Sequence, residues 1–322
     1  WLSGSELERQ VGYWSQQLQG APALLELPLD HPRPPVQRYR GAWVNQTFSP
    51  ELLAGLRALA ARENCTLFMV LLAAFKVLLA RYTGVEDVVV GTPIAGRRRT
   101  ELEGLIGFFL NTLALRTDVS GNPDFAEVLA RVRTTTLDAY EHQELPFEKL
   151  LEVLQPVRST AHTPVVQVMF NLHNEPASGL SLAGLSVQPF SIDRGTAKFD
   201  LSVALVESSA GLQAGFEYNT DLFERETVEL MLRHYGELLW AVTRDSRQHI
   251  AGYALTSADA LQSSQSRTAV DFGGADNLVA AFEHAAGLYA DRPAVHTAEG
   301  EWTYAQLNAR ANSVAALIQT TT

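Results

Sequence analysis

The sequence predicts an α/β fold in which helices cover a mixed sheet. Segments with helical apolar periodicity alternate with short strand-like segments through most of the 322-residue chain. One strand-like segment, "VEDVVVGTPI" (85–94), is a nearly continuous apolar run next to glycine, which is typical of a central strand. Hydrophobic residues make up 46% of the sequence, which is enough for a sizeable buried core.

Each predicted element has its own local signal. Ser49 followed by Pro50 is a typical helix start, and Thr66 is expected to cap the most apolar helix. Asp124 opens a further long helix. The predicted helices lie within residues 1–20 and at 51–64, 66–82, 125–143, 147–154 and 226–245. The predicted strands lie at 41–48, 85–94, 108–118, 166–173, 185–192, 198–207 and 211–219.

The character of the sequence changes after Asp245. We assign residues 1–245 to a first domain, and residues 246–276, which are polar, contain glycine and lack periodicity, to a linker. A new pattern covers residues 277–322, with a helix at 277–290, a strand at 294–297, a turn at 298–301 and a helix from 302. Both ends of the chain lie close to helical patterns, so we expect that it was cut from something longer.

Composition and charge exclude several classes of protein. The formal net charge of −11 argues against a nucleic-acid partner, which needs a basic face. Cys65 is the only cysteine, which excludes an internal disulfide framework and fits a reducing compartment. The most apolar run, 66–82, is interrupted by Lys76 and is interpreted as a buried helix rather than a membrane span. With no leader visible, we expect a cytoplasmic protein.

No catalytic or metal centre is visible in the sequence. The eight histidines include no adjacent pair, and no Gly-x-Ser-x-Gly elbow, Walker-type loop or Cys/His cluster at metal spacing is present. We therefore predict no catalytic residue and no metal ligand in this chain.

Three sequence blocks nevertheless carry a recognisable pattern. They are "LIGFFLNTLAL" (105–115), "HQELPFEKLL" (142–151) and "RSTAHTPVVQVMFN" (158–171). Together with the opening at 7–34, they resemble the condensation domain of nonribosomal peptide synthetases. The positions that match the family pattern are Ile106, Gly107, Phe109, Asn111, Thr112, His142, Gln143, Pro146, Phe147, Glu148, Arg158, Pro164, Gln167, Met169 and Phe170. Ser159 and His162 depart from it, because many members have aspartate and a second arginine there.

The end of the chain resembles the entry of an adenylation (AMP-binding) domain. "WTYAQLNARAN" (302–312) is similar to that family's first motif, with Trp302, Thr303, Tyr304 and Leu307 in place and Gln306 where glutamate is usual. The resemblance implies that the complete adenylation domain would use ATP and magnesium, and that its pocket would lie beyond this sequence.

The resemblance implies a fold and a role. The first domain would be the second of two chloramphenicol-acetyltransferase-like (CoA-dependent acyltransferase) lobes, without the His-His-x-x-x-Asp-Gly motif of the first lobe. It would form one wall of a tunnel for two phosphopantetheine-tethered substrates and help to form a peptide bond. Its implied partners are peptidyl carrier domains and the neighbouring adenylation domain, with no cofactor in the fragment itself. A non-catalytic carrier-docking or scaffold module is the alternative, and a free-standing acetyltransferase that uses coenzyme A is a weaker one.

Four residues are candidates for substrate binding, and each has a structural alternative. Asn111 either lines the tunnel or contacts the other lobe, or else it makes hydrogen bonds to neighbouring backbone groups. His142 either handles a proton or suits the C-terminal dipole of a helix. Arg97 either meets the phosphate of a carrier arm or lies in a solvated loop, and Phe109 belongs to the same block. The residues assigned to the structural motif are Gly107, Pro146, Phe147, Arg158, Met169 and Phe170.

Overall fold

The computed structural model describes residues 2–97, 100–157, 159–173, 194–256, 277–297 and 300–321. The chain divides into two compact units, Trp1–Ser257 and Ala258–Thr322, and each is described by itself. The predicted strand at 185–192 and the predicted motif residue Arg158 lie outside the described residues.

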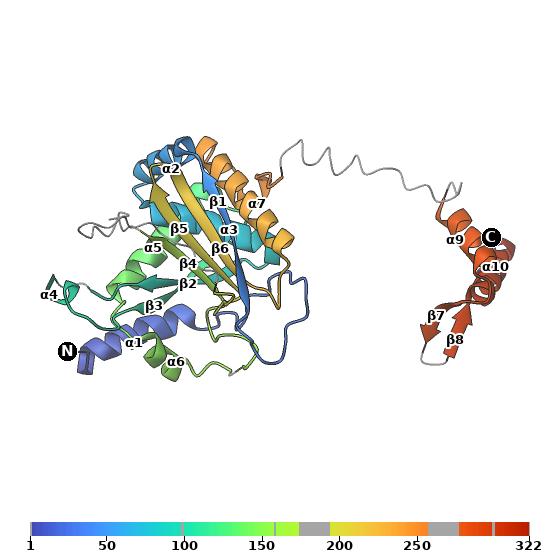
Figure 1. Cartoon of the computed structure of the whole chain (residues 1–322), viewed down its shortest axis with the longest axis horizontal. Coiled ribbons are helices and arrows are strands. Elements are labelled where there is room, and N and C mark those ends of the chain that lie inside the picture. Colours follow the sequence, from blue (N-terminus) through green and yellow to red (C-terminus); the bar gives the residue numbers. More distant parts are fainter. Residues whose placement is uncertain are drawn as a thin grey trace, which may run out of the picture. The chain divides into compact units, whose positions relative to one another are not determined.

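The first unit is built around a six-stranded mixed sheet (Figure 1). The strands are β1 (Gly41–Phe48), β2 (Asp87–Ile94), β3 (Asn111–Asp118), β4 (Val168–His173), β5 (Leu201–Ser208) and β6 (Gly211–Asn219). Their order is β1-β6-β5-β4-β2-β3, in which β4 pairs in parallel with both β5 and β2 and the other pairs are antiparallel. The β2–β4 pairing is short, with Gly91 opposite Met169 as its one register pair.

The helices begin where the capping residues predict. Ser49 accepts a hydrogen bond from the Leu52 amide, and Thr66 accepts one from the Met69 amide, so both satisfy a helix-terminal donor. Asp124 caps its helix in the same way. The helices of this unit are α1 (Gly4–Leu18), α2 (Pro50–Arg62), α3 (Leu67–Thr83), α4 (Thr100–Glu103), α5 (Phe125–Glu141), α6 (Phe147–Leu154), α7 (Arg225–Arg244) and the short 3₁₀ helix η1 (Ile250–Gly252).

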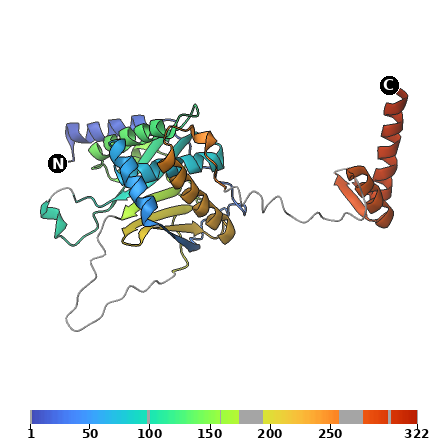
Figure 2. The ribbon, with the colours of Figure 1, turned by 90° about the horizontal axis from the view of Figure 1, so that it is seen from above.

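Within the described residues, the helices leave part of one sheet face uncovered. In β5, Leu201, Val203 and Leu205 are buried while the alternate residues are only half-buried, because successive side chains of a strand point to opposite faces. Helices α2, α3 and α7 cover the buried side, and Figure 2 shows them on one side of the yellow β5 and β6 strands. We call the other side of β1, β6, β5 and β4 the bare face.

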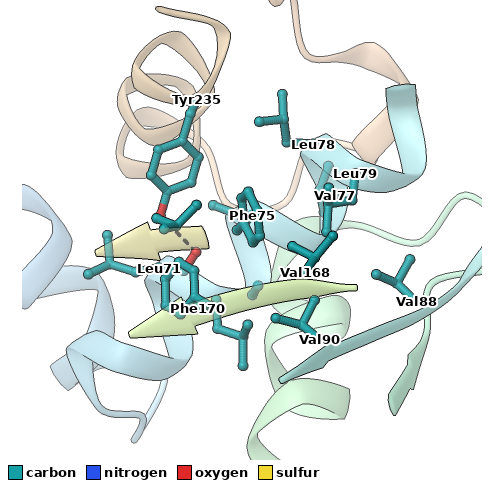
Figure 3. Packing of buried hydrophobic residues seen from close by; sticks show 14 of the residues in the cluster. Leu71, Phe75, Val77, Leu78, Leu79, Val88, Val90, Val168, Phe170 and Tyr235 are labelled. Carbon is teal, nitrogen blue, oxygen red and sulfur yellow. Dashed lines mark hydrogen bonds between the residues drawn. The ribbon is translucent and has the colours of Figure 1, made fainter. Parts of the chain in front are cut away.

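Helix α3 is buried on all sides and forms the centre of the core. Phe75 packs against Phe170 of β4, Phe216 of β6 and Tyr235 of α7, with ring centroids 5.4–6.1 Å apart. Figure 3 shows Phe75 with Phe170 and Tyr235, and the hydrogen bond that the Tyr235 hydroxyl donates to the Leu71 carbonyl over 2.9 Å. The sequence prediction of a buried helix at 66–82 is thus confirmed, including the burial of its lysine.

Three predicted boundaries are wrong. Residues 108–110, expected in a strand, precede β3, because its partner β2 ends at Ile94, opposite Asn111. Residues 198–200 precede β5, whose ladder with β4 begins at Leu201 opposite Val168. Residues 300–301, expected in a turn, belong to a strand that begins at Gly300, and the following helix starts at Tyr304 rather than 302.

The segment after Asp245 packs on the first unit instead of leaving it. The guanidinium of Arg81 donates to the carbonyls of Ile250, Ala251 and Tyr253 over 3.0–3.2 Å, and the Tyr253 side chain is buried. The first compact unit therefore continues into the stretch whose composition predicts a linker.

The second unit is a small α/β element. Strands β7 (Pro293–Thr297) and β8 (Gly300–Thr303) pair antiparallel between helices α9 (Leu278–Leu288) and α10 (Tyr304–Thr321). Several large apolar side chains on these helices are exposed, among them Leu278 at 89% and Val314 at 54%.

No single helix in the described part of the chain has the length and hydropathy to cross a membrane, although α2 and α3 pass that test together across a 102° bend.

Candidate functional site

The sequence blocks at Asn111 and at residues 142–147 meet in the structure. The Asn111 amide nitrogen donates to the carbonyls of Gln143 and Leu145 over 3.0 and 2.8 Å. Its carbonyl oxygen accepts from the amides of Phe147 and Thr112, both at 2.9 Å. All these bonds go to backbone, so the observed contacts correspond to the structural alternative, and a substrate contact stays a prediction. Asn111 fixes the entry into α6, where Pro146 occupies the N-cap position.

Replacing Asn111 with alanine is expected to lower the free energy of unfolding by about 2–3 kcal/mol. The substitution removes the partners of three half-buried backbone groups of the 143–147 loop, each worth about 1 kcal/mol. Denaturant unfolding of the wild type and the variant measures the difference. Asn45→Ala is the matched control, because the Asn45 side chain is exposed, and it should stay within about 0.5 kcal/mol. Equal effects of the two substitutions would contradict this role of Asn111.

His142 lies at the C-terminal end of α5 and is held on three sides. Its Nδ1 contacts the Asp138 carbonyl at 2.8 Å, and its Nε2 contacts the Arg9 guanidinium at 2.8 Å. A carbonyl only accepts and a guanidinium only donates, so Nδ1 carries the proton and Nε2 accepts. The ring also stacks on Tyr13 with centroids 4.0 Å apart. Both ring nitrogens are thus used by the protein, which is the structural alternative, and a proton-handling role of His142 stays a prediction.

Arg97 and Phe109 brace the loop between β2 and β3. The Arg97 guanidinium lies 4.2 Å from the centroid of the Phe109 ring and donates to the Leu102 carbonyl. A Cβ at Gly107 would lie 2.9 Å from the same ring, and a Cβ at Gly96 would lie 2.0 Å from the Phe109 carbonyl oxygen. Both glycines therefore allow the close approach of Phe109, which explains the first block of the resemblance.

The same loop presents apolar side chains to solvent. Ile106 is 104% exposed and Phe108 is 85% exposed, and Leu105 and Leu110 are more than half exposed. Single exposed apolar residues are common on protein surfaces, but four in one short loop form an apolar patch. Patches of this kind mark contact surfaces.

The last two motif residues lie on opposite sides of β4. Phe170 is fully buried against α3, where its ring contacts Phe75. Met169 points to the bare face and lies close to Gly91, where a Cβ would come within 2.5 Å of the Met169 sulfur. The motif therefore carries one core residue and one residue of the bare face.

A pocket of about 870 Å³ is hollowed into the bare face, and no sequence motif predicts it. We call it the sheet-face pocket, and its lining includes Trp43, Asn45, Met169, Asn171, Arg194, Lys198, Phe199, Ser202, Ala204 and Glu217. The pairing register places Trp43 opposite Glu217, Glu217 opposite Ser202, and Ser202 opposite Met169. One row of side chains therefore crosses four strands.

Electrostatics distinguish one member of this row. Burial raises the pKa of the Glu217 carboxyl, while hydrogen bonds from Trp43 and Ser202 and the charge of Lys198 act in the opposite direction. The alternation of polar side chains in "WVN" and "EYN" is the only sequence signal for this row, and it does not reveal which strands pair. In the described residues no group of three or more potential ligands is placed to hold a metal ion.

The model of the family described as Condensation domain matches residues 1–263. The chain belongs to this family. Condensation domains of nonribosomal peptide synthetases catalyse amide-bond formation as parts of multidomain enzymes. Their CoA-acyltransferase-like fold, with a mixed sheet and covering helices, is the fold of the first unit.

Curated relatives of the condensation domain family align along nearly the whole chain. One linear gramicidin synthase protein of Brevibacillus parabrevis is 48% identical over 99% of the chain, and Malpinin synthetase of Mortierella alpina is 42% identical over 98%. The chain spans only 6% and 4% of the lengths of these two proteins.

Solved structures resemble the condensation domain unit as well. The X-domain from teicoplanin biosynthesis is 28% identical, with a TM-score of 0.73 over 78% of this chain and 58% of its own. A four-domain nonribosomal peptide synthetase bound to AMP and glycine has a TM-score of 0.75 over 99% of this chain and 26% of its own. The latter is 23% identical, so this likeness concerns the fold alone.

Proposed function

We propose that the first unit forms one side of the site in which a condensation domain joins two carrier-tethered acyl groups. In that reaction an amine attacks a thioester carbonyl, a C–N bond forms, the C–S bond breaks and the thiol leaves with a proton. The observation that carries the proposal is the sheet-face pocket, which offers apolar walls and a few polar groups on an otherwise helix-covered sheet.

The exposed loop between β2 and β3 is evidence that a further lobe packs against this unit. Leu105, Ile106, Phe108 and Leu110 are apolar and exposed among the described residues, and Arg97 and Phe109 contact each other in the same loop. We propose that it packs on a further lobe. Since the sequence has no His-His-x-x-x-Asp-Gly segment, that lobe would supply the imidazole that manages the amine proton. The carrier domains of the complete synthetase would bring both substrates on phosphopantetheine.

We propose that the second unit is the opening of an adenylation domain. Thr303 and Gln306 form a reciprocal capping box at the start of α10: the Thr303 amide donates to Gln306 Oε1 over 2.9 Å, and the Gln306 amide donates to Thr303 Oγ1 over 3.3 Å. Glutamine thus performs the capping for which the adenylation motif uses glutamate, and the substitution leaves the resemblance intact. Further residues of that domain would cover the exposed apolar side chains of α9 and α10, and the complete domain would use ATP and magnesium.

The test of the condensation proposal is to fill the sheet-face pocket in the synthetase that contains this chain. Ala204→Trp places an indole in the pocket and should lower the yield of dipeptidyl thioester at least tenfold, measured by mass spectrometry of donor- and acceptor-loaded carriers. Gln213→Trp is the matched control, because Gln213 lies on the same face of neighbouring β6 outside the pocket lining, and its yield should stay within twofold. The isolated chain serves as a blank and should form no dipeptide.

A docking module is the second candidate, and one observation favours it. The X-domain of teicoplanin biosynthesis, 28% identical with a TM-score of 0.71, was solved in a complex with OxyB, so a similar fold contacts another protein. For a module that only docks, Ala204→Trp and Gln213→Trp would leave dipeptide formation equally unchanged. That result would overturn the condensation proposal.

A further inference from the structure

One wall of the sheet-face pocket is a segment that precedes a strand. We call residues 194–199 the wall segment, and β5 begins only after it, at Leu201. The members of the wall segment that line the pocket are Arg194, Thr196, Lys198 and Phe199. Because the ladder between β4 and β5 starts after these residues, contacts outside that ladder must fix their position.

The segment 33–41, which we call the strap, lies along the wall segment. The Ala197 amide donates to the Tyr39 carbonyl over 3.0 Å, and the Gly41 amide donates to the Gly195 carbonyl over 3.0 Å. A Cβ at Gly41 would lie 2.5 Å from the Ala197 nitrogen, so this close approach requires glycine. Tyr39 has a φ of 58°, a conformation that a non-glycine residue keeps only where its surroundings hold it. The strap and the wall segment therefore constrain each other.

Gln37 is the strap residue that joins the wall segment to the third sequence block. Its backbone amide donates to the Thr160 carbonyl over 2.8 Å, and its side-chain Nε2 donates to the Lys198 carbonyl over 2.8 Å. Thr160 Oγ1 in turn donates to the Pro35 carbonyl over 2.7 Å. The backbone of Gln37 is thus anchored on one side of the strap, while its side chain holds the wall segment on the other.

We infer that Gln37 is a positioning residue whose side-chain amide holds the wall segment in the place where it lines the sheet-face pocket. This inference rests on the proposed condensation function and adds a residue outside the pocket lining on which substrate binding depends. Without this bond the Lys198 carbonyl loses a donor, and the wall segment can shift away from the substrate. The wall contacts the substrate before and during the reaction alike, so its loss acts on KM rather than on kcat.

Hydrogen exchange in the 322-residue chain, followed by NMR, tests the positioning directly. Gln37→Glu keeps the shape of the side chain, but a carboxylate only accepts hydrogen bonds and has nothing to donate to the Lys198 carbonyl. We expect the Ala197 amide to exchange at least about tenfold faster in this variant. The Asp200 amide, which donates to the Gln167 carbonyl, should keep its rate. An unchanged rate at Ala197 would overturn the inference.

Steady-state kinetics of the synthetase that contains this chain test the consequence for the reaction. A pocket of about 870 Å³ holds one substrate-sized group, so Gln37→Glu should raise the KM of one of the two loaded carriers. The expected rise is about fivefold, with kcat within about twofold of the wild type. A general loss of folded protein would instead lower the rate at an unchanged KM. An unchanged KM for both carriers would overturn the inference.

Two further variants show whether the N–H donor itself matters. Gln37→Lys restores a donor at the same position and should return KM to within about twofold of the wild type. Gln17→Glu is the matched control, because the half-buried Gln17 donates in the same way to the Arg116 carbonyl and lies outside the pocket lining. It should change neither KM nor the exchange of Ala197. A KM in Gln37→Lys as high as in Gln37→Glu, or an equal rise in Gln17→Glu, would contradict the role of the donor.

The failure of this inference is distinguishable from the failure of the proposed function. If Ala204→Trp abolishes dipeptide formation while Gln37→Glu changes neither KM nor exchange, the condensation proposal stands and the positioning role of Gln37 falls. If Ala197 exchanges faster in Gln37→Glu but Ala204→Trp leaves the product yield unchanged, Gln37 positions the wall segment and the condensation proposal falls.

Discussion

Replacing Arg33 with methionine should lower the free energy of unfolding by about 3–5 kcal/mol, the range for removing one partner of a buried ion pair. Arg33 Nη1 and Nη2 donate to the two carboxylate oxygens of Asp200 over 2.9 and 2.6 Å. The Asp200 side chain is 2% exposed and that of Arg33 is 15% exposed. Without the guanidinium, the carboxylate is left in the interior with neither charge compensation nor its two best donors. Chemical denaturation at neutral pH measures the loss.

Two further variants separate this explanation from a general loss of packing. The double variant Arg33→Met with Asp200→Leu removes both charges and should recover most of the stability, because an apolar pair of similar size has no desolvation cost. Arg225→Met is the matched control: Arg225 pairs with Glu229 at 3.4 Å, and the two side chains are 55% and 41% exposed, so the loss should stay within about 1 kcal/mol. A loss at Arg33 no larger than at Arg225 would contradict the burial argument.

The ion pair also explains how the proline-rich segment is placed. Residues 26–39 have the composition of an extended crossing segment, and Arg33 fastens this segment to the residue just before β5. The nearby charges Lys198 and Asp200 do not serve each other: Asp200 binds Arg33, and the charge of Lys198 lowers the pKa of Glu217.

Substituting Lys76 should change how stability depends on pH. The Lys76 ammonium is fully buried and donates to the Leu115 carbonyl over 2.6 Å, to Thr117 Oγ1 over 2.8 Å and to the Val88 carbonyl over 3.3 Å. Burial lowers its pKa from 10.5 to about 7, and the nearby Asp87 acts in the opposite direction. Between these two values the unfolded chain holds a proton that the folded chain has released. The contribution of Lys76 to the free energy of unfolding therefore rises as the pH increases from about 7 to 10.5.

The expected slope is at most about 1.4 kcal/mol per pH unit, the limit for one proton. Below pH 7 both states are protonated, and the group contributes its full desolvation cost. Lys76→Met should remove the slope, and at pH 6 the variant should be as stable as the wild type or more stable by about 1–4 kcal/mol. Denaturant unfolding from pH 6 to pH 9.5 checks both expectations. Lys149→Met, at a side chain 48% exposed, should keep the wild-type slope, and an unchanged slope in Lys76→Met would contradict the assignment.

Local signals in the sequence predicted local structure well. The caps at Ser49, Thr66 and Asp124 lie within a few residues of the groups they bind, so propensity and spacing were enough to place those helix starts. The predicted strand 108–118 is confirmed from Asn111 onward, but its start was placed three residues too early. Its first three residues have apolar side chains, and apolarity alone cannot distinguish a strand from a loop whose apolar residues are exposed.

The features that the sequence did not predict depend on contacts between segments that are distant in the sequence. Asn111 stands out in the sequence as the one polar residue in the apolar segment 108–111, but three of its partners lie 32–36 residues further on, and no sequence periodicity links the two segments. The partners Arg33 and Asp200 are 167 positions apart. The sheet-face pocket depends on the register of four strands that span the unit, and a shift of one residue would turn every one of its side chains to the core.

Helix α3 connects two parts of the sheet that share few backbone hydrogen bonds. Between β4 and β2 the strands share a single register pair, so the ladder is interrupted there. The adjacent residues Phe75 and Lys76 lie on either side of this interruption: the ring packs on β4 and β6, and the ammonium binds carbonyls of β2 and β3. The β2–β3 pair and the other four strands are thus connected through one turn of α3 as well as through the single β2–β4 register pair.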